Sequence, residues 1–237
     1  MFDHVTIGVA DADASHRFYD AAFAALEVPV TRGEEYFEWG DFSIGLAPRR
    51  ARTQRAHIAL AARSRAHVEA FWRASVAAGG VDNGPPGLRP RYHDDYYGAF
   101  VLDPDGNNVE AVFHGSAGRP GAIDHLGVRV RNVELARRFY ATVLEPLDVH
   151  AVDYGPTGFG GRGGHLWLHD GQPTQKLHFA FAAADNAAVE AFWRAGTEAG
   201  FIDNGPPGER PHYHPGYFGA FLLDPDGNNV EAVCHNR

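Results

Sequence analysis

Two histidines and one glutamate recur in the same order in both halves of the chain, and together they could bind a metal ion. The members are His4, His57 and Glu110, followed by His125, His178 and Glu231. Equivalent members are separated by the same distance in sequence, because 125−4, 178−57 and 231−110 all equal 121. Two imidazoles and one carboxylate form a facial set of ligands that leaves other positions on a divalent metal open. The pattern predicts Fe(II) or Mn(II), with Zn(II), Co(II) or Ni(II) as alternatives.

The segment around Glu110 indicates where its side chain points. Asp103 to Glu110 reads D-P-D-G-N-N-V-E and returns letter for letter as Asp224 to Glu231. Asp-Pro-Asp-Gly predicts a turn, and the strand that follows places Glu110 on the face opposite Val109 and Phe113. A carboxylate facing a closed interior is costly unless it is paired or bound to metal. Core histidines satisfied by hydrogen bonds are the structural alternative, but the repetition of the whole set favours a metal.

The repeat extends over the whole chain. The segments H-I-A-L from His57, V-E-A-F-W-R-A from Val68 and D-N-G-P-P-G from Asp82 return as similar or identical segments 121 positions later. A period this long indicates two copies of a domain-sized unit. We expect one domain over residues 1–114 and another over 122–237. The linker would be residues 115–121, whose composition, G-S-A-G-R-P-G, is typical of a connecting segment.

Hydrophobic periodicity divides each copy into two modules of one strand, one helix and about three strands. Val68, Phe71, Trp72 and Val76 are expected to form the buried stripe of the second helix. The fold class is therefore α+β with four βαβββ modules. The elements expected in the first copy are strands Asp3–Val9, Glu35–Trp39, Phe42–Ala47, Arg55–Leu60, Tyr96–Leu102 and Asn107–Phe113, with helices Ala14–Leu26 and Arg65–Ala78.

On these motifs the whole chain resembles a tandem member of the vicinal oxygen chelate superfamily. That group includes glyoxalase I, type I extradiol dioxygenases, fosfomycin-resistance enzymes and bleomycin-resistance proteins. The resemblance implies curved, cup-like sheets built from paired modules. It also implies that the four histidines and two glutamates named above are metal ligands, three for each metal. Each triad could close within one copy. Alternatively, His4 could join His178 and Glu231, while His125 joins His57 and Glu110.

Departures from the family motifs narrow the expected activity. The fourth ligand of glyoxalase I would fall at Gly45 in one copy and at Leu166 or Trp167 in the other, so glyoxalase isomerisation is not expected. Fosfomycin-type enzymes lack that fourth ligand and match the triad. The extradiol dioxygenases imply further catalytic positions. These are His93 and His214 as acid/base residues, and Tyr96 and Tyr217 as substitutes for a motif tyrosine replaced by Phe100 and Phe221.

The segment after each second helix supplies candidates for substrate binding. D-N-G-P-P-G and the residues that follow it are expected either to line the site or to form a rigid turn before the next strand. An arginine there could hold an anionic substrate. His114 and His235 are expected on the surface. The substrate-binding candidates are Arg89, Tyr92, Phe100, Arg210, Tyr213 and Phe221.

Composition limits the class of partner and compartment. The 237 residues have a formal net charge of -9, which argues against nucleic acid as a partner. The single cysteine, Cys234, suits a reducing cytoplasm, and no apolar run or signal segment indicates a membrane or secretion. We expect a small-molecule ligand and a monomer or homodimer. The function expected is a divalent-metal enzyme, with an Fe(II) extradiol-type dioxygenase as the best single choice. The alternatives are a resistance protein that binds a drug or aromatic ligand without turnover, and a fosfomycin-type transferase.

Overall fold

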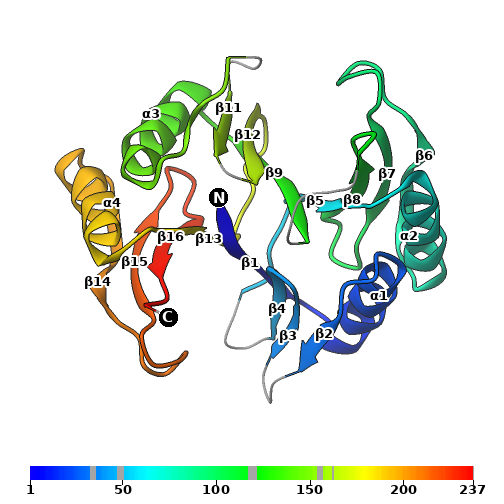
Figure 1. The fold of residues 1–237 in the computed structure, drawn as a ribbon, viewed down its shortest axis with the longest axis horizontal. Helices are drawn as coiled ribbons and strands as arrows, with labels where there is room; N and C mark the ends of the chain where they lie inside the picture. Colours follow the sequence, from blue (N-terminus) through cyan, green and yellow to red (C-terminus); the bar gives the residue numbers. More distant parts are fainter. Residues whose placement is uncertain (33–35, 47–50, 117–121, 154–156, 162, 237) are drawn as a thin grey trace. The chain divides into compact units, whose positions relative to one another are not determined.

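The computed structural model describes residues 1–32, 36–46, 51–116, 122–153, 157–161 and 163–236, and its fold is α+β (Figure 1). The chain divides into two compact units. We call Thr6–Gly127 the N-terminal unit, and Met1–Val5 together with Val128–Arg237 the C-terminal unit. Most of the expected linker, residues 117–121, and the expected strand ends Glu35 and Ala47 lie outside the described residues.

The order of elements is the predicted βαβββ module, found four times in the described part of the chain. The first half contains β1 (Phe2–Val9), α1 (Ala12–Ala25), β2 (Val30–Arg32), β3 (Tyr36–Trp39), β4 (Phe42–Leu46), β5 (His57–Ala61), α2 (Arg65–Ala77), β6 (Val81–Leu88), β7 (Tyr97–Leu102) and β8 (Asn108–Phe113). The second half contains β9 (Ile123–Val130), α3 (Val133–Leu144), the short 3₁₀ helix η1 (Glu145–Leu147), β10 (His150–Ala151), β11 (Gly158–Gly161), β12 (Gly164–Asp170), β13 (His178–Ala182), α4 (Asn186–Glu198), β14 (Ile202–Glu209), β15 (Phe218–Leu223) and β16 (Asn229–Cys234). None of the helices in the described ranges is long and apolar enough to span a membrane.

Strands β1 and β9 cross the boundary between the units, so each contributes residues to both. In the N-terminal unit the strand order is β6-β7-β8-β5-β9, and a second run is β1-β4-β3-β2. The C-terminal unit has the corresponding orders β14-β15-β16-β13-β1 and β10-β11-β12-β9. Strand β5 runs parallel to β8 and antiparallel to β9, and β13 runs parallel to β16. The first residues of β1 therefore lie among strands of the second sequence copy.

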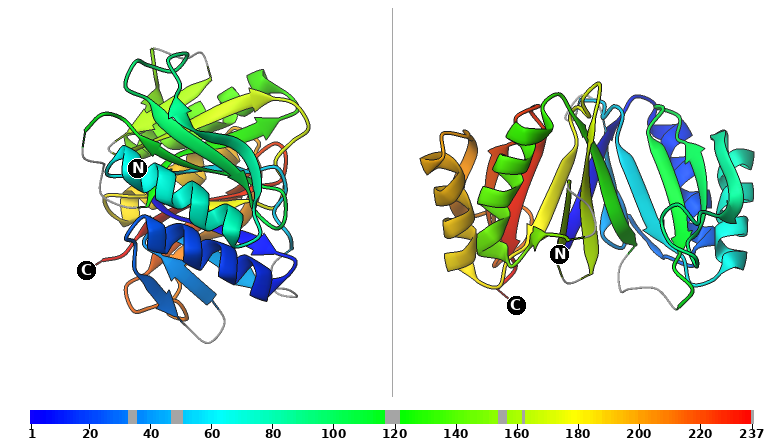
Figure 2. Two further views of the ribbon diagram at one scale, coloured as in Figure 1. Left: turned by 90° about the vertical axis from the view of Figure 1, so that its right-hand side faces the viewer. Right: turned by 90° about the horizontal axis from the view of Figure 1, so that it is seen from above.

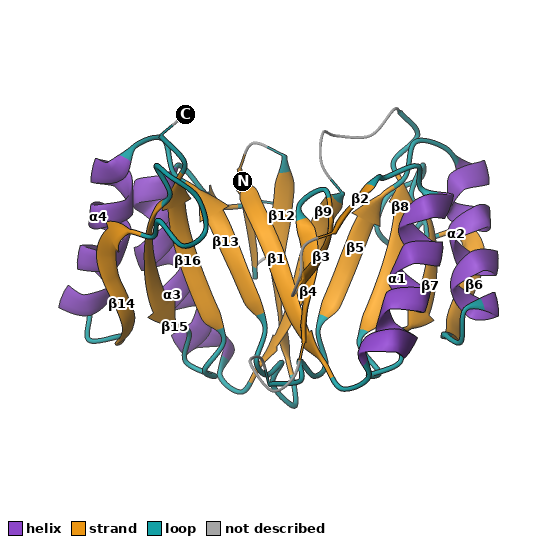
Figure 3. Cartoon of the chain, turned by 90° about the horizontal axis from the view of Figure 1, so that it is seen from below, coloured by secondary structure: helices purple, strands orange, loops and turns teal. Residues whose placement is uncertain are grey.

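In each unit the helices cover one face of the strands (Figure 3). In the N-terminal unit α2 packs on β6, β7 and β8, and α1 lies beside α2 (Figure 2). Val68 and Phe71 are fully buried, as expected. Trp72 and Val76 are only half-buried, so this part of the expected stripe is wrong. Ser75 is buried instead.

The segment D-N-G-P-P-G is not a turn that precedes a strand, because it is itself the edge strand β6. Its pairing with β7 is interrupted by register shifts around Gly84, where φ is 149° and favours glycine. Prolines are tolerated at a sheet edge because no neighbouring strand needs their missing N–H groups. The prediction of a rigid turn before the next strand is therefore wrong at this position, and β14 repeats the same structure.

The repeated turn before β8 is anchored by a buried carboxylate. Asp103 Oδ1 accepts hydrogen bonds from the backbone N–H groups of Asp105 and Asn107 at 2.9 and 2.8 Å. Asp103 Oδ2 accepts from the Tyr19 hydroxyl at 2.7 Å, and Gly106 takes the positive φ of 82° that the turn requires. Asp224 repeats these bonds, with Tyr140 in place of Tyr19. The turn thereby fixes where each glutamate strand begins.

Candidate metal centres

The register of three strands brings His57, Glu110 and His125 together in the N-terminal unit. Ala59 of β5 lies opposite Glu110 on one neighbouring strand and opposite His125 on the other. Because side chains alternate along a strand, His57 points to the same face as Ala59. His57 Nε2 is 3.2 Å from Glu110 Oε2 and 3.2 Å from His125 Nε2, and His125 Nε2 is 3.6 Å from the same oxygen. Glu110 and His125 are buried.

The C-terminal unit contains the equivalent triad of His4, His178 and Glu231. His4 Nε2 and His178 Nε2 are 3.1 Å apart, and they lie 3.6 and 3.2 Å from Glu231 Oε2. Each triad thus combines a histidine from one sequence copy with the histidine and glutamate of the other. Of the two arrangements left open by the sequence, the structure has the exchanged one.

These separations fit the donor set of a divalent metal. In each triad the facing ligand atoms all lie within 4.8 Å of one another. With metal–ligand bonds of about 2.1 Å, ligand atoms are about 3.0 Å apart at octahedral angles and about 3.4 Å apart at tetrahedral angles. Glu231 Oε2 is buried and has no hydrogen-bond partner, which is unfavourable unless a cation satisfies it. The residues present therefore fit a metal ion.

A tyrosine fixes the other oxygen of each glutamate. The Tyr96 hydroxyl donates to Glu110 Oε1 at 2.6 Å, and Tyr217 donates to Glu231 Oε1 at the same distance. Burial, followed by the nearby carboxylate, raises the pKa of both tyrosines far above the ordinary value. Gly98 lies against this pair, since a Cβ there would be 2.7 Å from Glu110 Oε1. The tyrosine therefore leaves Oε2 of the glutamate to face the two imidazoles.

One histidine of each triad is backed by the preceding aspartate. His125 Nδ1 is 2.9 Å from Asp124 Oδ1, and His4 Nδ1 is 2.8 Å from Asp3 Oδ1. Burial alone would raise the pKa of Asp124, but hydrogen bonds with His114 and His125 lower it well below its ordinary value. The same balance, with His4 and His235, lowers the pKa of Asp3. Both aspartates are therefore ionised acceptors, and they favour the tautomer whose unprotonated Nε2 could bind a metal.

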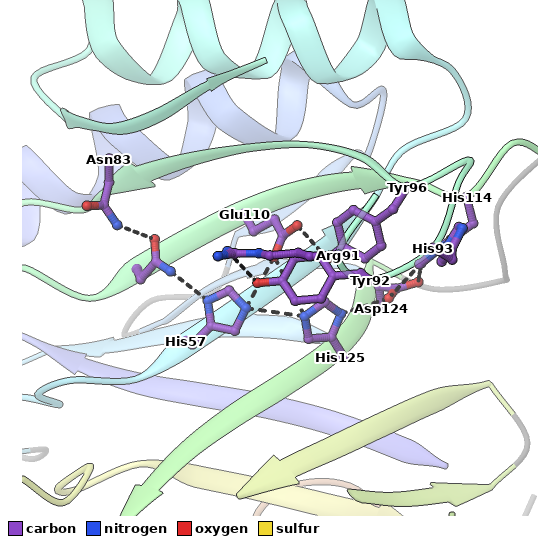
Figure 4. A network of polar contacts seen from close by, with 11 residues as sticks. His57, Asn83, Arg91, Tyr92, His93, Tyr96, Glu110, His114, Asp124 and His125 are labelled. Atoms are coloured by element: carbon purple, nitrogen blue, oxygen red, sulfur yellow. Dashed lines mark hydrogen bonds and ion pairs between the residues drawn. The ribbon is translucent and has the colours of Figure 1, made fainter. Parts of the chain in front are cut away.

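Each aspartate also contacts a histidine that was expected on the surface, and that histidine contacts a predicted acid/base histidine. His114 Nε2 is 3.1 Å from Asp124 Oδ1, and His114 Nδ1 is 2.8 Å from His93 Nε2 (Figure 4). His235 is only part-exposed, and it links Asp3 to His214 at 2.8 Å on each side. Asp124 and Asp3 were not predicted from the sequence, although each directly precedes a candidate ligand. The partners of His114 and His235 were also missed, because these contacts join distant strands.

The other histidine of each triad contacts one asparagine side chain, which in turn accepts a hydrogen bond from a second asparagine. Nδ1 of His57 lies 2.8 Å from the side-chain nitrogen of Asn108, and Asn83 donates to Asn108 at 3.0 Å. The equivalent contact joins His178 to Asn229 at 2.9 Å, again backed by an asparagine of the edge strand. The edge strand β6 therefore reaches the site through an amide. These asparagines were also missed, since no motif distinguishes them in the sequence.

The substrate-binding candidates contribute aromatic rings close to the triads. Phe100 lies beside His57 with ring centroids 6.3 Å apart, and Tyr92 packs on Tyr96 at 4.7 Å. Tyr92 is 52% exposed. Phe221, Tyr213 and Tyr217 repeat this arrangement in the C-terminal unit.

The two arginine candidates also contact the edge strands. The Arg89 guanidinium lies over the Phe100 ring and donates to the backbone oxygen of Pro85 at 2.6 Å. Arg210 makes the equivalent contacts with Phe221 and Pro206. Each arginine therefore braces its edge strand, and a role in holding an anionic substrate stays a prediction.

Fold and site together define a protein built from tandem βαβββ modules with two His-His-Glu centres, and comparison with known sequences agrees. The family model described as Glyoxalase/Bleomycin resistance protein/Dioxygenase superfamily matches residues 1–111 and again 122–232. The chain belongs to this superfamily, as the sequence resemblance predicted. No curated protein matches the sequence closely enough to count as a relative.

Solved structures support the fold. A mutant of glyoxalase I from Zea mays is 20% identical over 99% of this chain and 92% of that chain, with a TM-score of 0.69. A putative dioxygenase from Bacillus subtilis subsp. subtilis str. 168 is 14% identical over 100% of this chain and 85% of that chain, with a TM-score of 0.65. At these identities the likeness concerns the fold alone.

Replacing Tyr96 by phenylalanine is expected to weaken metal binding in the N-terminal unit about tenfold or more, as is typical for loss of a group that orients a ligand. The substitution removes the donor to Glu110 Oε1 and leaves that buried oxygen unsatisfied. The dissociation constant for Co(II) can be measured by absorbance titration. Tyr97→Phe is the matched control, since the Tyr97 hydroxyl contacts Glu69 on the helix side. Equal affinities of Tyr96→Phe and the parent protein would contradict a positioning role.

Proposed function

We propose that this protein is a divalent-metal enzyme of the vicinal oxygen chelate type that acts on a small oxygenated molecule. The observation that supports it is the pair of triads, each with two imidazole nitrogens and a buried carboxylate oxygen within 4.8 Å of one another. His4, His178 and Glu231 would hold one ion, and His57, Glu110 and His125 would hold the other. When bound, the metal would act as a Lewis acid toward neighbouring oxygens of the substrate.

A ligand set of this kind favours particular metals. Two neutral histidines and one carboxylate in a facial arrangement suit Fe(II) or Mn(II), while Zn(II), Co(II) and Ni(II) accept the same donors. Among the described residues each group contains three ligand residues and no fourth. The positions that the family resemblance gives for a fourth ligand, Gly45 and Leu166 or Trp167, have no side chain that could bind metal or take a proton. We therefore do not propose glyoxalase isomerisation.

For the reaction we propose extradiol-type dioxygenation of an aromatic substrate with Fe(II). Phe100 lies beside His57, Tyr96 hydrogen-bonds to Glu110, and Tyr92 packs on Tyr96. Aromatic rings this close to the triad favour stacking with a planar substrate. We propose His93 and His214 for proton transfer. Tyr96 and Tyr217 were also expected to be catalytic, but their bonds to the glutamates favour a role in positioning the ligand.

The test is a metal analysis of anaerobically purified protein, followed by oxygen uptake with a panel of catechols. We expect two ions per chain, one for each triad, and oxygen consumption that depends on Fe(II). Removal of the metal with a chelator should abolish uptake, and Fe(II) should restore it. Metal binding without oxygen uptake would exclude dioxygenation and leave a transferase or another metal-assisted reaction. Tight binding of aromatic ligands by protein with only trace metal would overturn the proposal in favour of sequestration.

A further inference from the structure

A string of hydrogen-bonded side chains leads outward from a ligand histidine of the N-terminal unit (Figure 4). His125 Nδ1 lies 2.9 Å from Asp124, Asp124 lies 3.1 Å from His114 Nε2, and His114 Nδ1 lies 2.8 Å from His93 Nε2. Asp124 is buried and His93 is exposed, so the string connects the interior with the surface.

The C-terminal unit contains the same string, built from residues 121 positions away in sequence. His4 Nδ1 lies 2.8 Å from Asp3 Oδ1, and Asp3 Oδ2 lies 2.8 Å from His235 Nε2. His235 Nδ1 in turn lies 2.8 Å from His214 Nε2. Nearby positions differ between the copies, since Asp94-Asp95 corresponds to Pro215-Gly216. The contacts are therefore retained where the adjoining loop has changed, but the outermost link differs, because His214 Nδ1 donates to the backbone oxygen of Pro215 at 2.7 Å.

The direction of the hydrogen bonds in the N-terminal unit follows from their partners. His93 Nδ1 accepts the backbone N–H of Asp95 at 3.2 Å, so His93 Nε2 is the atom that donates to His114. His114 then donates from Nε2 to Asp124, and His125 donates from Nδ1 to the same carboxylate. With its proton on Nδ1, His125 presents an unprotonated Nε2 toward Glu110. One set of neutral tautomers thus satisfies every link and prepares the ligand atom for a metal.

We propose that His114 and His235 are positioning residues for the two metal centres. Each holds the aspartate carboxylate against the ligand histidine, which fixes the orientation of that imidazole and the location of its proton. Without His114, Asp124 loses a donor inside a buried environment and can rotate away from His125. The proposal rests on the proposed metal function, and it adds a role for two histidines that lie outside the triads.

The experiment uses the full chain with one triad disabled, so that one site is measured at a time. In a His178→Ala background, the remaining site is titrated with Co(II) alone and followed by absorbance. We expect His114→Ala to raise the dissociation constant about tenfold to a hundredfold, the usual effect of removing an outer partner of a ligand. His114→Gln, whose amide N–H can donate to Asp124, should restore part of the affinity. Circular dichroism checks that each variant is folded.

Two further comparisons separate positioning from a general structural effect. His235→Ala in the same His178→Ala background belongs to the disabled site, and it should leave the Co(II) affinity of the remaining site unchanged. In an Asp124→Ala background, His114→Ala should have no further effect, because His114 acts through that carboxylate. The inference would be overturned if His114→Ala lowered the Co(II) affinity equally with and without Asp124, or did not lower it at all. Either result would leave the proposed metal function standing. Failure of the His178→Ala parent to bind Co(II) would overturn the inference together with the proposed metal function.

Discussion

Replacing Glu110 by alanine is expected to reduce the metal content from two ions per chain to one, and to leave the Glu231 centre loaded. Glu110 is the anionic member of its triad, and its Oε2 lies 3.2 Å from His57 Nε2. Loss of an outer partner already costs about tenfold to a hundredfold in metal affinity, so loss of the carboxylate itself should cost more than about a hundredfold. The measurement is metal per chain after dialysis, supported by Co(II) titration.

Controls for this prediction are available within the chain. Glu231→Ala should give the complementary result, with the N-terminal centre loaded, and the double variant should bind no metal at either centre. Glu69→Ala removes a carboxylate of the same unit that contacts Tyr97 and Arg73 on the helix side, and it should retain both ions. Two ions in Glu110→Ala would show that the triad is not the binding site.

Replacing Asp103 by alanine is expected to destabilise the N-terminal unit by about 3–5 kcal/mol, because several buried donors lose their acceptor and each unsatisfied group costs about 1–3 kcal/mol. The donors are the backbone N–H groups of Asp105 and Asn107, the Asn107 amide and the Tyr19 hydroxyl. Burial raises the pKa of Asp103 above its ordinary value, which means that burying this carboxylate is itself unfavourable. Asp103 therefore stabilises the fold through these hydrogen bonds. The change can be measured as a shift of the urea unfolding transition of metal-free protein.

Tyr19→Phe provides a graded control for Asp103, because it removes one of these hydrogen bonds and keeps the aromatic ring in the core. It should cost about 1 kcal/mol, the usual net contribution of a single hydrogen bond. Asp224→Ala should affect the C-terminal unit in the same way, since Asp224 binds Tyr140 and its own turn. A loss below about 1 kcal/mol for Asp103→Ala would mean that water or neighbouring groups replace the carboxylate.

The correct predictions from sequence depend on local patterns. The alternation around Glu110 and the Asp-Pro-Asp-Gly turn define a strand and the face of its glutamate, and both are properties of consecutive residues. The edge strand β6 was missed because glycine and proline are typical of turns, and only its position at a sheet edge makes a strand compatible with Pro85 and Pro86. His114 could not be placed for a similar reason, since its partner Asp124 lies on another strand.

The sequence by itself determined the duplicated βαβββ modules, the residue types of the two triads and the superfamily to which the chain belongs. It did not determine which histidine completes which triad. Strand pairing decides this, because β9 lies beside β5 and carries His125 to His57 and Glu110. Such pairing depends on contacts between residues far apart in sequence, which no local pattern records. Only the tertiary structure brings residues of both copies together at each triad and places Asp124 and His114, or Asp3 and His235, beside them.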